Sequence, residues 1–95
     1  MSERVTLPAD VAELLSAIVE ALDLPIPSID PADEHARYRL LERRAQFVAI
    51  ALRGVLQYPD YPDLESDAAW LRRHTARFPL TYTAYVPSGR KGGVV

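Results

Sequence analysis

The sequence predicts a mainly α-helical fold, a three-helix domain with a long central helix and an extended or strand-like C-terminal segment. Apolar residues recur every three or four positions through most of the 95 residues, which is typical of amphipathic helices. Prolines and aspartates stand where helices are expected to begin. Near the C-terminus a run of β-branched and aromatic residues replaces this pattern. We expect one small domain at 1–87 and a disordered tail at 88–95.

The central helix is predicted to run from Asp30 to Gln57. Asp30 is placed to cap it, and Pro31 suits the first helical position because its missing N–H is not needed there. Spacing of three and four positions places one set of residues on a single face: Tyr38, Leu41, Ala45, Val48, Leu52 and Val55. Further apolar side chains lie on other sides, so we expect protein around most of the helix's second half.

The first helix is predicted to run from Pro8 to Asp23, with Leu7 packed back on its first turn. Its apolar face consists of Val11, Leu14, Leu15, Ile18, Val19 and Leu22. Two prolines stiffen the following link, Leu24–Ile29, whose apolar residues are expected to lie against the core. A link this short favours an antiparallel pair of helices.

The third helix is predicted at Leu64–Arg77, after a Tyr-Pro-Asp-Tyr-Pro-Asp turn at 58–63. Acidic residues at its start and basic residues at its end follow the order that the helix dipole favours. The run 80–86 alternates like a strand, and a strand needs a partner. The alternatives are Arg4–Leu7, the same run of a second subunit, or no partner, with the run lying extended over the helices.

Charge is unevenly distributed along the chain, although the net charge is only −2. Residues 1–30 hold six acids against one base, a net of −5, while the remainder is mildly basic. We expect these parts to attract each other within one molecule or between two. The acids of the first helix could also receive a basic partner.

No motif for catalysis, cofactor binding or metal binding is present, and the chain has no cysteine. His35 follows two acids, and His74 shares a helix side with Asp67, but neither has a recognisable nucleophile or oxyanion donor. We therefore expect no enzyme, no cofactor and no metal. No apolar run reaches the length of a membrane span, and a cytoplasmic location is expected.

Two groups of arginines could contact phosphate. Arg39 and Arg43 belong to the central helix, and Arg72, Arg73 and Arg77 belong to the third. These residues support an alternative function as a nucleic-acid-associated accessory protein. The acidic first third disfavours it, because charge dominates affinity for nucleic acid.

The leading prediction is a non-enzymatic protein–protein interaction or accessory domain that either self-associates as a homodimer or binds another protein. We expect a nearly fully buried core of Leu15, Ile18, Leu41, Val48 and Leu52. Phe47 and Ile50 would then point away from it as a contact surface. The alternative is that the strand-like segment 80–86 folds over Phe47 and Ile50 and completes a monomer.

Three stretches carry a resemblance to other sequences: the opening LPADVAELLSAIVEALDLPIP, the Asp-Glu-His start of the central helix and the ending TYTAYVP. In these stretches the chain resembles short uncharacterised proteins of actinobacterial genomes. The resemblance covers most of the chain. It implies no activity and no site residues.

Overall fold

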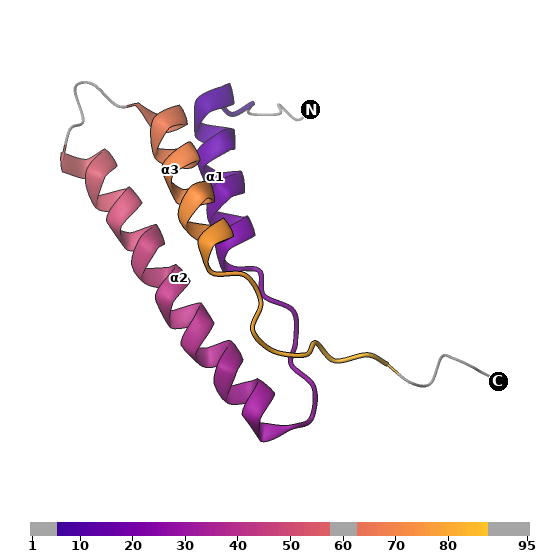
Figure 1. The fold of residues 1–95 in the computed structure, drawn as a ribbon. Helices are drawn as coiled ribbons and strands as arrows, with labels where there is room; N and C mark the ends of the chain where they lie inside the picture. The colour runs from indigo at the N-terminus through magenta and orange to yellow at the C-terminus, as the bar shows by residue number, and fades with distance from the viewer. Residues whose placement is uncertain (1–5, 58–62, 88–95) are drawn as a thin grey trace.

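The computed structural model describes residues 6–57 and 63–87, and it confirms the mainly α-helical prediction. The helices are α1 (Ala9–Leu22), α2 (Pro31–Gln57) and α3 (Leu64–Arg77). α1 and α3 run in the same direction and α2 runs in the opposite one, with α3 between them in the view of Figure 1. The predicted turn at 58–63, except Asp63, and the predicted tail at 88–95 lie outside the described residues.

The predicted cap of α2 is confirmed, and α3 has a cap of the same kind. The Asp30 carboxylate accepts the N–H of Ala32 at 2.9 Å, and the Asp63 carboxylate accepts the N–H of Ser66 at 3.1 Å. Each bond satisfies one of the backbone donors that a helix start leaves without an internal partner. α1 has no side-chain cap and begins directly after Pro8.

α1 packs mainly against α3 and only lightly against α2. Three alanines are fully buried where the core forms, Ala17 and Ala21 on α1 and Ala68 on α3. Small side chains let helix backbones approach closely, and Leu71, also fully buried, fills the space beside them. The predicted antiparallel pairing of the first two helices is therefore secondary to a parallel α1–α3 contact.

α2 turns a different face to the core from the predicted one. Its buried residues are Leu40, Arg44, Val48 and Ala51. At about 100° per residue, the centre of this face is roughly 75° from the centre of the predicted face. Val48 is buried as predicted, but Leu52 is 40% exposed, so the prediction for Leu52 is wrong.

The other core predictions fare similarly. Leu15 is 45% exposed, contrary to prediction, and Ile18 and Leu41 are only half-buried. Leu7, which was predicted to pack back on the first turn, is 50% exposed. On α1 and α3, alanines take inward places beside the buried Leu14 and Leu71.

Two side chains account for the orientation of α2. Phe47 packs against Trp70, His74 and Phe78, with ring centroids 6.1, 4.9 and 5.5 Å away. Arg44 is 6% exposed and points inward between the ends of the other two helices. Turning both toward α3 necessarily turns Ala45 and Leu52 outward, since these lie on the opposite flank.

Arg44 joins all three helices. Its guanidinium donates to the carbonyl oxygen of Ala21 at 3.3 Å and to that of Phe78 at 2.8 Å. These carbonyls belong to the C-terminal ends of α1 and α3, where the helix dipoles concentrate negative potential. Burial lowers the pKa of Arg44 from its usual value, but an arginine stays charged at neutral pH.

A second apolar cluster lies beside the N-terminal half of α2 and consists of Leu24, Leu40 and Tyr82. The Tyr82 hydroxyl donates to the carbonyl of Pro25 at 2.6 Å. In Figure 1 the α1–α2 link and the segment after α3 run next to each other here.

The partner of the C-terminal segment is the α1–α2 link, which was not among the predicted alternatives. Pro27 and Ala84 form an antiparallel bridge, flanked by bonds from Ser28 N–H to Thr83 and from Tyr85 N–H to Ile26. In the described ranges no longer strand forms. Leu24 lies in the core as predicted, but Ile26 and Ile29 are 70% and 93% exposed, because the bridge uses the backbone of the link.

The orientation of α2 can be tested by truncating residues on its two faces. We expect Val48→Ala to lower the free energy of unfolding by about 1–3 kcal/mol, because it removes buried methyl groups. Leu52→Ala should lower the free energy of unfolding of the monomer less than Val48→Ala does, although Leu52 is the larger side chain. Urea titrations below the concentration of any self-association would measure both. The opposite order would contradict this orientation.

The role of Arg44 can be tested with Arg44→Met. The substitution leaves the carbonyls of Ala21 and Phe78 without their donor, which should cost about 1–3 kcal/mol of unfolding free energy. Hydrogen exchange of the Tyr85 amide should also accelerate, because the segment after Phe78 loses its anchor. Arg39→Met, on the exposed side of the same helix, is the control. Equal stabilities of the two variants would refute a joining role for Arg44.

Candidate functional site

The rotation of α2 leaves an apolar row exposed along it, which we call the outer stripe. Tyr38, Leu52 and Leu56 are 62%, 40% and 77% exposed, Ala45 is exposed, and Ala49 is half-buried. Residues 38, 45 and 52 are seven apart, as are 49 and 56, which is the repeat of a helix that packs along another helix. The stripe spans 19 residues, or about 27 Å at 1.5 Å per residue.

α1 also exposes an apolar row. Leu15 and Val19 are 45% and 60% exposed. They lie on the flank of α1 away from Glu13 and Glu20, which reach toward Arg72 of α3. The outer stripe likewise lies across α2 from Phe47, which packs on α3. Both exposed rows therefore face away from α3.

The predicted contact residues on α2 separate in the structure. Phe47 is half-buried among aromatic side chains of α3, so the prediction that it lies uncovered is wrong. It is covered by α3 and Phe78, and not by the 80–86 segment as the alternative held. Ile50 is 47% exposed, but it lies outside the outer stripe. Ala49 and Leu56 are seven positions apart in the sequence, but the prediction placed the contact surface at Phe47 and Ile50, which are the larger pair.

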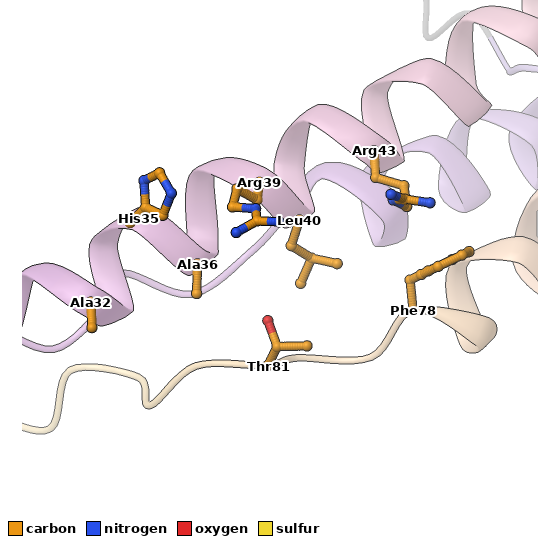
Figure 2. A pocket seen from close by; sticks show the side chains of 8 residues that line it. All are labelled: Ala32, His35, Ala36, Arg39, Leu40, Arg43, Phe78 and Thr81. Carbon is orange, nitrogen blue, oxygen red and sulfur yellow. The ribbon is translucent and has the colours of Figure 1, made fainter.

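A basic groove lies on another side of α2, between its N-terminal half and the segment after α3 (Figure 2). Its volume is about 480 Å³, and it is lined by Ala32, His35, Ala36, Arg39, Leu40, Arg43, Phe78 and Thr81. Figure 2 shows Leu40 and Thr81 pointing into the space between the two segments, with His35 on the outer side of α2. No acidic residue lines this groove.

Arg39 and Arg43, the two arginines of the groove, differ in their partners from Arg37 and Arg44 of the same helix. The Arg43 guanidinium lies 4.8 Å from the centroid of the Phe78 ring, a cation–π contact. Arg37 donates to the carbonyl of Pro25, and Arg44 to two helix ends. Within the described part of the chain, neither Arg39 nor Arg43 has a carboxylate within ion-pair distance.

The predicted phosphate-contact residues on α3 are arranged differently. Arg72 forms ion pairs with Glu13 and with Glu20, the latter at 3.0 Å. The expected attraction between the acidic first third and the basic remainder thus occurs within one molecule. Arg73 and Arg77 are exposed, and Arg73 lines a second hollow together with Glu13 and Glu65. The structure does not gather Arg72, Arg73 and Arg77 into one basic surface free of acids.

The two histidines lie in different parts of the structure, His35 at the basic groove and His74 beside Trp70. The Nδ1 atom of His74 lies 2.9 Å from the carbonyl oxygen of Trp70, and its ring stacks on that of Trp70 at 4.0 Å. His74 is therefore part of the aromatic packing around Phe47. Asp33, two positions before His35, accepts a hydrogen bond from the hydroxyl of Ser28 at 2.6 Å near the start of α2.

Among residues 6–57 and 63–87, no group of three or more histidine, cysteine, aspartate or glutamate residues could hold a metal ion. None of the helices described is long and apolar enough to span a membrane.

Comparisons of the chain with protein-family models, with curated proteins and with solved structures find no match. The outer stripe and the basic groove are therefore interpreted from their own geometry.

The ion pairs of Arg72 predict a pH dependence of stability. The hydrogen bond from Arg72 lowers the pKa of Glu20, so the pair stabilises the fold above the usual glutamate pKa, about 4.3, and loses that contribution as pH falls through the lowered pKa. Glu20→Gln should cost at most about 1 kcal/mol at pH 7, since the pair is exposed. The difference from the original protein should shrink toward pH 3.

Thermal unfolding between pH 3 and pH 7 would measure this difference. Glu65→Gln, a glutamate outside the ion pair, is the control. A Glu20→Gln effect of the same size at both pH values would contradict the assignment.

Proposed function

We propose that the protein is a non-enzymatic interaction domain that self-associates through the outer stripe of α2. The observation that carries this proposal is the seven-residue repeat of exposed apolar side chains at Tyr38, Ala45 and Leu52, with Ala49 and Leu56 beside it. An exposed apolar row of this length on a small protein marks a contact surface.

A second copy fits the stripe in an antiparallel arrangement. Pairing α2 with α2 of a second copy about residue 47 sets Tyr38 opposite the other copy's Leu56, and Ala45 opposite its Ala49. Both pairs share this midpoint, so one two-fold axis generates them, as in most homodimers. The large side chains meet at the ends, and the alanines at the centre let the helices approach closely.

Charge supports the same arrangement. Glu42 and Arg53 lie on one flank of the stripe and share nearly the same midpoint, so each Glu42 would lie beside Arg53 of the other copy. A parallel arrangement would instead leave Glu42 and Arg53 of the other copy eleven positions, or about 17 Å, apart along the helices. Neither residue has an ion-pair partner in the described part of its own chain.

The nucleic-acid alternative has less support. It depends on Arg72, Arg73 and Arg77, and two glutamates of α1 already bind Arg72. Binding to DNA or RNA through this set would require Arg72 to exchange its glutamate partners for phosphate. We also propose that the protein works in the cytoplasm, where a chain without cysteine needs no disulfide to fold.

Light scattering coupled to size exclusion tests the self-association. We expect a mass of twice 10.6 kDa at micromolar concentration. Leu56→Glu should give a folded monomer, because a side chain that is 77% exposed adds little to the fold of one chain. Ile50→Glu, on α2 but outside the stripe, is the matched control and should remain a dimer. A monomeric original protein, or dissociation by Ile50→Glu alone, would contradict the proposal.

Charge exchange tests the antiparallel register. Glu42→Arg should weaken the dimer about two- to tenfold, because it places like charges together at two symmetric positions. Adding Arg53→Glu to the same chain should restore the affinity. If the double variant were weaker than the single one, the register would be wrong.

A further inference from the structure

We propose that the basic groove binds a small organic anion with an apolar body, whose carboxylate or phosphate sits between Arg39 and Arg43. The groove is on another side of α2 from the outer stripe, and by residue spacing their centres are roughly 140° apart around the helix axis. The proposal therefore stands apart from the proposed self-association.

The two arginines are spaced to hold one anionic group. They lie four positions apart on α2, so that their side chains emerge one above the other about 6 Å apart. Guanidinium groups match carboxylate and phosphate oxygens with paired hydrogen bonds. His35 continues the row by a further turn, at the rim of the groove.

Arg43 is held in place before any ligand arrives. Its guanidinium lies over the ring of Phe78. Phe78 is fixed at the end of α3, because its backbone carbonyl accepts a hydrogen bond from the Arg44 guanidinium. Stacking on an aromatic face leaves the N–H groups at the edge of the guanidinium free to donate. A side chain ordered in this way loses less entropy on binding.

The remainder of the groove suits an apolar body. Ala32, Ala36, Leu40 and Phe78 supply apolar surface next to the arginines, and about 480 Å³ is within the range of small-molecule sites. The hydroxyl of Thr81 points into the same space. Glu42 borders a neighbouring hollow with both arginines and does not line the groove.

Titrations monitored by amide NMR would test this site with matched probes. The probes are 1-naphthyl phosphate and 1-naphthoate, which distinguish phosphate from carboxylate, with inorganic phosphate as the anion alone and 1-naphthol as the apolar body alone. We expect one of the two naphthyl anions to bind at least about fivefold more tightly than inorganic phosphate or 1-naphthol, with shifts at Ala36, Leu40 and Thr81.

Matched variants identify the contact. Arg39→Gln and Arg43→Gln should each weaken binding at least about fivefold, whereas Arg73→Gln, an exposed arginine of α3, should leave it unchanged. Leu56→Glu should also bind normally, since the outer stripe is elsewhere on α2. The proposal would be overturned if neither naphthyl anion bound more tightly than inorganic phosphate and 1-naphthol, or if Arg73→Gln lost as much affinity as Arg39→Gln and Arg43→Gln.

Discussion

The fold depends on one buried cation. Arg44 lies at the centre of α2 and donates to carbonyls at the ends of α1 and α3, which it can reach together because these helices run in the same direction and end at the same level. Taking a guanidinium out of water is costly, and here no carboxylate among the described residues compensates for it. Two helix ends do so instead, since each concentrates negative potential on carbonyls that lack internal partners. The position of α2 relative to both other helices follows from this contact.

The same contact determines which surfaces remain exposed. Arg44 occupies a position on the inward face of α2 that an apolar side chain could otherwise fill. α2 has more apolar residues than that face can hold, and the surplus lies along the outer stripe. The alanines at the α1–α3 contact have a similar effect, because Leu15 and Val19 are left on the flank of α1. Exposed apolar surface in this protein therefore arises from the way its core is built.

Helix boundaries could be predicted from the sequence because they depend on local chemistry. Asp30 caps α2 as expected, and the predicted ends of the helices agree with the structure within a residue or two. The orientation of α2 could not be predicted in this way. Its apolar residues are compatible with more than one inward face, and an arginine would not be assigned to the core without knowing that two helix ends meet there. The pairing of 80–86 with the α1–α2 link was missed for a related reason, since it uses backbone atoms between residues with no shared pattern.

The candidate sites were predictable to a lesser degree. The ion pairing of Arg72 agrees with the uneven charge along the chain, and Arg39 and Arg43 were recognisable as a pair. The groove between them and Phe78 could not be predicted without the fold. Phe78 is 35 positions from Arg43 in sequence, and only the fold brings the two together.

The length of α2 explains why both candidate surfaces belong to it. At 1.5 Å per residue its 27 residues span about 40 Å, while the 14 residues of α1 and of α3 span about 21 Å each. Two helices of half its length cover only its C-terminal half, and the second apolar cluster must cover the remainder with extended chain. Extended chain covers one flank of a helix and leaves a hollow at its edge, which is where the basic groove lies. The outer stripe runs along the flank that neither the short helices nor the extended segments reach, so a partner of comparable length, such as a second α2, is the natural complement to it.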